Sequence, residues 1–185
     1  MRLLDFKGLR ASPLAIISPD TKYYGDGEVI VGARTRIDDG CIFTGSVWLG
    51  ARVHVPPCCI FYGKAGIEVG DYSSLGTYSV FHSESDDFSG RSLFGPCVPD
   101  SYRPDVWRDR VKIGAHVLFG TRTTILPGVT IHEGGAVGAH SLVKDDCPEW
   151  TIIAGTPAKT VGTRNREAYM ALLRQFEGSL IGVAA

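Results

Sequence analysis

The sequence lacks an excess of charge of either sign. Its 19 Lys and Arg side chains are balanced by 20 Asp and Glu side chains, which leaves a formal net charge of -1 at pH 7. A general nucleic-acid-binding protein normally shows a strong basic excess. The charge balance therefore argues against nucleic acid as a partner.

Long apolar runs are also absent. Asp5, Lys7, Arg10 and Pro13 interrupt the start of the chain, so we expect no secretory signal there. No later segment approaches the roughly 18 apolar residues that cross a membrane. These absences predict a cytoplasmic protein with no membrane span.

Cysteine pairs with metal-ligand spacing are missing as well. The chain has 5 Cys, an odd number, and none of them forms a CxxC pair. A disulfide framework and a zinc ribbon are therefore not expected. Glycine, by contrast, is abundant, with 23 residues beside 10 Pro in a chain of 185 residues. That length suits a single domain, and the glycine content prompts a search for internal repeats.

An apolar residue recurs at every sixth position over most of the chain, with one two-residue offset before position 69; we call this row the comb. Its members are Val31, Ile37, Phe43, Leu49, Val55, Phe61, Val69, Leu75, Phe81, Ile113, Phe119, Ile125, Ile131, Val137 and Val143. A period of six fits neither a helix nor a two-sided strand, and it is typical of a parallel β-helix. Two positions earlier stand small or β-branched residues, including Cys41 and Cys59, which suit a narrow interior at the turns. With three hexapeptides per coil, the fold class predicted is all-β, a parallel β-helix of about five coils.

The comb divides the chain into a β-helix domain over residues 1–163 and a helix over residues 164–178. It vanishes at about residues 84–110, and an inserted loop of this length in a compact domain is normally functional. The first 28 residues are less regular and suggest an incomplete opening turn. In the C-terminal segment we expect an amphipathic helix with Asn165 as its N-cap and Gly178 as its stop, covering the open end or a side of the prism. Its apolar stripe consists of Tyr169, Leu172, Leu173 and Phe176.

The segments ILPGVTI, VGAHSLV and IAGTPAK all lie within residues 113–159. Together they resemble the C-terminal coils of the bacterial hexapeptide-repeat acyltransferases. The SDDFSG loop, followed by a Pro-rich aromatic stretch, is similar to that of the sugar O- and N-acetyltransferases of surface-polysaccharide pathways. This resemblance covers roughly residues 29–166. It implies a left-handed β-helix, a homotrimer, acetyl-CoA as donor and an active site between neighbouring subunits.

Acetyl transfer from a thioester needs a base for the attacking group, a donor for the oxyanion and alignment of both substrates. His82 directly follows the comb residue Phe81 and directly precedes the loop. Members of the family commonly carry their catalytic His at the edge of such a loop. We therefore choose His82 as the base and His116 as the second choice; the alternative is that His82 is a surface residue at the start of the loop.

Further candidates lie in the loop and at the coil corners. Asp86 and Asp87 could orient His82, or they could bind a hydroxyl or amino group of the sugar. A backbone N–H from the glycine-containing corners at Gly120 or Gly138 could stabilise the oxyanion.

Coenzyme A brings negative phosphates, which basic side chains can bind. Lys159 and Arg164 lie in a stretch without acidic residues and are the candidates for phosphate contact. The resemblance places the tail of the coenzyme near the segment that contains Ala154, Gly155 and Lys159.

Two other functions remain open from the sequence. One is a noncatalytic trimeric scaffold, because the comb by itself is purely structural. The other is a metal-dependent hydratase of the γ-carbonic-anhydrase type, although the close HxxxxH pair of that enzyme is absent and we expect no metal. The sequence does not show whether the sugar accepts through oxygen or nitrogen, or whether it is free, nucleotide-linked or lipid-linked.

Overall fold

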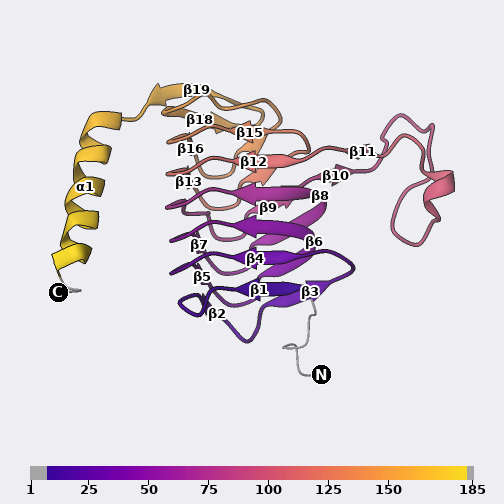
Figure 1. Ribbon diagram of the computed structural model, residues 1–185. Coiled ribbons are helices and arrows are strands. Elements are labelled where there is room, and N and C mark those ends of the chain that lie inside the picture. The colour runs from indigo at the N-terminus through magenta and orange to yellow at the C-terminus, as the bar shows by residue number, and fades with distance from the viewer. Residues whose placement is uncertain (1–7, 183–185) are drawn as a thin grey trace.

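The computed structural model describes residues 8–182, which form a prism of stacked, three-sided β coils (Figure 1). Its first side contains β1 (Leu9–Ala11), β4 (Val29–Val31), the ends of β6 (Ile42–Leu49) and β8 (Ile60–Val69), β12 (Val111–Ile113) and β15 (Thr130–Ile131). Its second side contains β2 (Ile16–Ile17), β5 (Arg36–Ile37), β7 (His54–Val55), β13 (Leu118–Phe119), β16 (Ala136–Val137) and β18 (Thr151–Gly155). Its third side contains β3 (Lys22–Tyr24), the starts of β6 and β8, β9 (Val80–His82), β14 (Thr124–Ile125) and β17 (Leu142–Val143).

The strand register explains the period of six. Ile42 pairs in parallel with Ile60, and Arg36 pairs in parallel with His54, so a partner stands eighteen residues later, or three hexapeptides along the chain. Every comb residue points inward and is buried. The parallel β-helix class predicted from the comb is therefore confirmed.

Aromatic side chains stack along the inside of the third side. The ring centroids of Phe43 and Phe61 are 4.6 Å apart, and those of Phe61 and Phe81 are 4.9 Å apart. These distances match the spacing of about 4.8 Å between neighbouring strands. Burial of each such side chain contributes about 1.5–3 kcal/mol, so the core is a continuous stabilising column.

The small residues two positions before the comb residues donate hydrogen bonds to the backbone at the turns. Thr35 Oγ1 donates to the carbonyl of Gly50 at 2.6 Å, and Ser73 Oγ donates to the carbonyl of Gly114 at 2.9 Å. The thiol of Cys41 donates in the same manner to the carbonyl of Pro56 at 3.3 Å. These buried groups satisfy backbone oxygens that the turns leave without strand partners.

The opening coil is complete, unlike the partial turn that the sequence suggested. The strands β1, β2 and β3 supply its three sides and pair with β4, β5 and β6 of the next coil. The stack therefore contains one full coil more than the five that the comb marked. Its inward positions are Ala11, Ile17 and Tyr23, which pair with the comb residues Val31, Ile37 and Phe43. The comb missed this coil because eight residues, and not six, separate Tyr23 from Val31.

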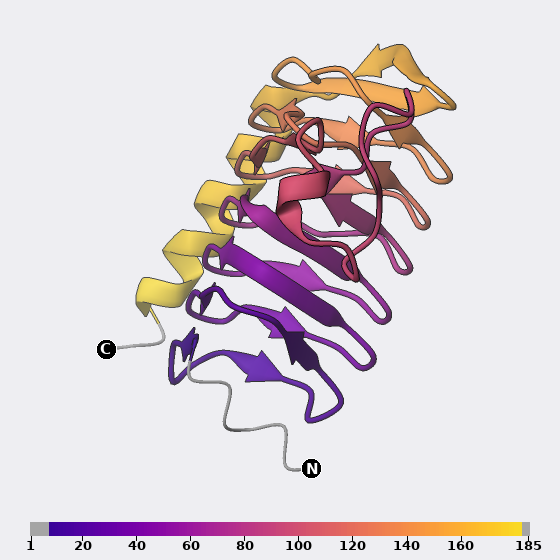
Figure 2. The same ribbon diagram turned by 90° about the vertical axis from the view of Figure 1, so that its right-hand side faces the viewer.

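The stack remains continuous across the inserted loop. After β9 the chain forms the antiparallel pair β10 (Glu84–Ser85) and β11 (Trp107–Arg108), with the 3₁₀ helix η1 (Asp100–Tyr102) between them. The strand β12 then pairs with β8 as though no loop intervened. Figure 2 shows the loop folded in front of the stacked coils.

The far end of the stack is closed by a hairpin. β18 pairs antiparallel with β19 (Ala158–Thr163) after the parallel coils end. The helix α1 (Arg166–Gly182) follows and runs back along one side of the prism (Figure 1). Asn165 Oδ1 accepts a hydrogen bond from the amide of Ala168 at 2.9 Å, which makes Asn165 the N-cap.

Helix α1 continues past Gly178, where we had expected it to stop. A single exposed glycine costs about 1 kcal/mol within a helix, which is too little to end one that is otherwise supported. The support comes from a row of side chains at one corner of the prism, which we call the corner ladder: Arg52, Tyr72, His116 and Trp150. All four residues have a positive φ, between 54° and 62°. The helix thus covers a side of the prism.

Glycines at one corner let successive coils approach closely. A Cβ on Gly76 would lie 1.9 Å from the carbonyl oxygen of Gly120, and a Cβ on Gly120 would lie 2.3 Å from the amide nitrogen of Ala139. Both neighbours are backbone atoms, which cannot rotate away. These positions therefore exclude any side chain.

We predict that Gly76→Ala destabilises the protein by about 1–3 kcal/mol, the usual cost of overpacking. The matched control is Gly178→Ala, since a Cβ there meets nothing within 4 Å. This control is expected to stabilise α1 by up to about 1 kcal/mol. Denaturant unfolding of both variants measures the two effects, and an unchanged stability of Gly76→Ala would contradict the close approach.

Candidate active site

The candidate acceptor site lies at the corner where the third side of each coil passes into the first side of the next. Tyr24, Thr44, Tyr62 and His82 occupy the same register position in four successive coils. Their comb neighbours, such as Phe61 and Phe81, point inward and are fully buried, so these four side chains point outward. The corner therefore carries a row of ring and hydroxyl groups next to the loop.

A cavity of about 720 Å³ lies between this row and the loop. It is within the size range of small-molecule sites. Its titratable side chains include Asp26, Lys64, His82, Glu84, Asp86, Asp100 and Arg103. Carboxylates thus outnumber cations, which favours an acceptor that carries a positive charge or several hydroxyl groups.

His82 stands at the end of β9 and lines this cavity. It is half-buried, and its ring stacks on Tyr62 with the centroids 5.0 Å apart. Burial lowers the pKa of His82 below its usual 6.5, so the imidazole is neutral at pH 7. No hydrogen bond to either ring nitrogen is found within residues 8–182. The side chain is therefore in the protonation state of a base, and its nitrogens are not occupied by the protein.

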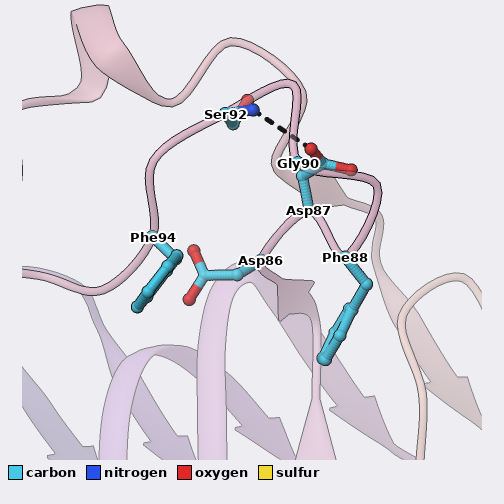
Figure 3. Close-up of a pocket in the computed structure, with 6 residues that line it drawn as sticks. All are labelled: Asp86, Asp87, Phe88, Gly90, Ser92 and Phe94. Atoms are coloured by element: carbon cyan, nitrogen blue, oxygen red, sulfur yellow. Dashed lines mark hydrogen bonds between the residues drawn. The ribbon is translucent and has the colours of Figure 1, made fainter.

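The two loop carboxylates have different surroundings. Asp87 accepts hydrogen bonds from the amides of Ser89, Arg91 and Ser92, and the bonding at Ser89 contributes most to lowering its pKa to about 2. Figure 3 shows the bond between Asp87 and Ser92. Asp87 therefore holds the loop in shape, and it does not contact His82 as an orienting group would. Asp86 lines the cavity and remains a candidate for substrate contact.

A second cavity of about 440 Å³ lies within the loop itself, lined by Asp86, Asp87, Phe88, Gly90, Ser92 and Phe94. Phe88 is 95% exposed and Phe94 is 73% exposed. Figure 3 shows the two rings on either side of Asp86, whose carboxylate points toward Phe94. Asp86 lines both cavities, so the two spaces share a wall.

His116 lies elsewhere, in the corner ladder beneath α1. Its ring stacks on Tyr72 at 5.5 Å, and its Nδ1 is 3.3 Å from the hydroxyl of Tyr169. Figure 1 shows α1 and the loop on different sides of the prism. The structure therefore does not bring His116 and His82 together within one subunit, and His116 has a packing role.

The two residues expected to bind the coenzyme phosphates, Arg164 and Lys159, lie in different surroundings. The Nη1 atom of Arg164 donates to the carbonyls of His116 at 2.7 Å and Gly134 at 2.6 Å, and the guanidinium lies over Trp150 and Tyr169. Arg164 thus ties α1 to the coils. Lys159 is largely exposed, and its Nζ is 3.9 Å from Asp145, so it retains the freedom to bind a phosphate.

The glycines chosen for the oxyanion do not have free amides. Gly120 N donates to the carbonyl of Val137 at 2.7 Å, and Gly138 N donates to the carbonyl of Ile153 at 2.8 Å. A Cβ on Gly138 would lie 2.7 Å from the Cβ of Ala154, so the coils are tightly packed there. Ala154 pairs with Lys159, and Gly155 pairs with Ala158, at the hairpin that closes the stack. The amides of Gly120 and Gly138 themselves are therefore occupied by hydrogen bonds between coils within one subunit.

Sequence reasoning missed most of the cavity wall, including Tyr24, Asp26, Tyr62, Lys64 and Arg103. One feature of the sequence could have indicated part of this wall. The comb gains two residues between Phe61 and Val69, which marks this corner as the place where the coils vary in length. Residues 62–66, including Lys64, lie within β8, which runs through this corner without a break.

Two further observations concern metal and membrane. Over residues 8–182, no three His, Cys, Asp or Glu side chains come close enough together to hold a metal ion. Within the same range, no helix has the length and apolar content needed to cross a membrane.

Known proteins resemble this chain over nearly its whole length, although no protein-family model matches it. A dTDP-4-amino-4,6-dideoxy-D-glucose acyltransferase from Escherichia coli is 32% identical over 169 residues, which cover 90% of this chain and 87% of the relative. A putative lipopolysaccharide biosynthesis O-acetyl transferase, WbbJ from Escherichia coli K12, is 47% identical over 75 residues, which cover 40% of this chain and 38% of the relative.

A solved structure shows the same similarity in three dimensions. It is a variant of AntD, an N-acyltransferase from Bacillus cereus, in complex with dTDP-4-amino-4,6-dideoxyglucose and Coenzyme A. It is 33% identical, covers 95% of this chain and 92% of its own, and gives a TM-score of 0.86. The coil stack, the loop and the full-length similarity together show that this chain belongs to the hexapeptide-repeat sugar acyltransferases, with their left-handed β-helix fold.

Proposed function

We propose that this enzyme transfers an acetyl or other short acyl group from acyl-CoA to the amino group of a nucleotide-linked deoxysugar, with His82 as the general base. The observation that carries the proposal is the cavity of about 720 Å³ in which His82 and several carboxylates meet at the loop. The relative from Escherichia coli is named as an acyltransferase of a dTDP-linked amino sugar, and the AntD variant is bound to such a sugar. A cytoplasmic location and a role in making a surface-polysaccharide precursor fit this proposal, because both substrates are cytoplasmic metabolites.

The carboxylates of the cavity bear on whether the acceptor atom of the sugar is nitrogen or oxygen. An amino group reaches the cavity mostly as an ammonium ion, and Asp86 and its neighbours stabilise that charge. Only the neutral amine has a lone pair for attack on the thioester carbon. A base must therefore take one proton, and neutral His82 on the same wall is placed to do so.

The reaction then proceeds by direct attack. The amine nitrogen forms a bond to the carbonyl carbon, becomes positively charged and releases its second proton to water. The tetrahedral intermediate then collapses as the carbon–sulfur bond breaks. The leaving thiolate takes up a proton, for which protonated His82 is the source. The protein contributes alignment and this proton transfer, and no covalent acyl-enzyme is required.

The proposal is tested by acyl-CoA consumption with a panel of amino and hydroxy sugars, free and dTDP-linked. Turnover is expected with dTDP-linked amino sugars, and the hydroxy sugar of the same stereochemistry is the matched control. Transfer to the hydroxy sugar alone would contradict the amino acceptor. Absence of transfer to every sugar would contradict the enzyme function.

We predict that His82→Ala lowers turnover by about 10²–10⁴-fold, the usual contribution of a positioned general base. Because burial lowers the pKa of His82, the midpoint of the acidic limb of wild-type activity should lie below 6.5, the usual pKa of histidine. The variant should lose that acidic limb. His116→Ala is the control, since it should reduce thermal stability through the corner ladder and leave turnover near wild type. If His116→Ala lost turnover and His82→Ala kept it, His116 would be the base.

Lys159 and Arg164 are predicted to respond differently to substitution. Lys159→Ala should raise the Michaelis constant for acyl-CoA with little change in turnover, because a phosphate contact acts equally in the ground and transition states. Arg164→Ala should lower the melting temperature, because its donors hold α1 to the coils. Steady-state kinetics and thermal unfolding measure both effects, and an unchanged Michaelis constant for Lys159→Ala would contradict the phosphate contact.

We also propose a homotrimer, in which the groove between two prisms holds the extended arm of the coenzyme. A single prism offers the coenzyme only one wall, and a neighbour supplies the second. Light scattering should give a particle of three times the 20.0 kDa chain. An active species of 20.0 kDa would contradict a site between subunits.

A further inference from the structure

Five charged side chains converge at the base of the loop. Arg108 binds both Glu84 and Asp100, with a distance of 3.2 Å between Arg108 Nη2 and Asp100 Oδ1. Arg103 lies 3.2 Å from the same Asp100 oxygen and 3.9 Å from Glu84, and it also binds Asp86. Two cations thus hold three carboxylates that come from both ends of the loop.

Arg103 is the inner member of this group. Its side chain is only 8% exposed, so its charge must be compensated by neighbours within the protein. Its Nη2 donates to Asp86 Oδ1 at 2.9 Å, and its Nη1 donates to Asp100 Oδ1 at 3.2 Å. The planar guanidinium therefore fixes the relative positions of two carboxylates that lie fourteen residues apart in the sequence.

Asp86 is held at both of its oxygens. Oδ1 accepts from Arg103, and Oδ2 accepts from the amide of Gly95 at 3.2 Å. The same carboxylate forms the wall between the two cavities. A small rotation of Asp86 would alter both spaces, so whatever fixes this side chain also fixes the shape and charge of the acceptor site.

We propose that Arg103 is a positioning residue for the acceptor: it holds the Asp86 carboxylate at the boundary of the two cavities in the orientation that binds the sugar. This inference rests on the function proposed above. Arg103 acts through Asp86, and the nitrogen of the acceptor is contacted by the carboxylate rather than by the guanidinium. Lysine cannot replace it, since a single ammonium group lacks the fork that reaches Asp86 and Asp100 together.

The test uses Arg103→Gln and Arg103→Lys in the full-length enzyme, with dTDP-4-amino-4,6-dideoxyglucose as the acceptor probe. Both variants should bind the probe about 10–100-fold more weakly by calorimetry, the range for loss of an orienting charge-assisted hydrogen bond. The Michaelis constant for the probe should rise in proportion, while that for acyl-CoA should stay near wild type. The control is Arg91→Gln, which breaks an exposed pair with Asp105 in the same loop and should leave both constants unchanged.

A double-mutant comparison separates positioning from a general effect on the loop. In the Asp86→Asn background, Arg103→Gln should weaken probe binding little further, because its target carboxylate is already gone. An additional loss as large as that in the wild-type background would overturn the positioning role. So would full restoration of probe binding by Arg103→Lys, since charge alone would then suffice.

Failure of the two proposals can be distinguished. If the wild-type enzyme neither binds nor acylates any amino sugar, the proposed function fails, and the role of Arg103 fails with it. If the wild-type enzyme acylates the probe and Arg103→Gln binds it equally well, only the positioning role fails. Thermal unfolding should show that the coils remain intact in each variant, because the charged group lies outside the stacked strands.

Discussion

The packing of one inward side chain per hexapeptide is the constraint on which the whole structure depends. Neighbouring coils are held at β-sheet spacing by parallel hydrogen bonds, so a side chain on one coil meets the equivalent side chain of the next. The column of Phe43, Phe61 and Phe81 shows this directly, with centroid distances of 4.6 and 4.9 Å. Glycine satisfies the same constraint at the corners, where Gly76 and Gly120 leave no space for a Cβ.

The constraint applies to the interior and leaves the corners free. A corner can lengthen without changing the register, and β12 pairs with β8 after the loop as if the chain had continued directly. The corner that carries His82 uses this freedom with two extra residues within β8 and with the loop itself. The corner beneath α1 uses it differently, with large side chains such as Tyr72 and His116 that the helix covers. A rigid interior therefore supports two unlike surfaces, one suited to binding and one to packing.

The loop is held in its own shape by charge more than by apolar contact. Phe88 and Phe94 remain exposed, whereas Arg103 is buried among carboxylates. Ion pairs of this kind add little net stability, but their geometry is specific. For an acyltransferase that works by alignment, such specificity matters more than stability, because misplacing an acceptor by a small distance reduces the rate strongly.

The sequence by itself determined the fold class, the position of the loop and the place of His82 at the junction, since each follows from where a local period holds or breaks. It also determined the N-cap at Asn165, which depends on residues only three positions apart. Only the tertiary structure decided that Arg164 binds the carbonyls of the corner beneath α1, that Gly120 and Gly138 have no free amide, and that Arg103 meets Asp86. The physical reason is that these contacts join residues from different coils or from opposite ends of the loop. A repeat shows which side chains point inward, whereas the partners of the outward side chains depend on how the turns, the loop and the helix fold back onto the stack.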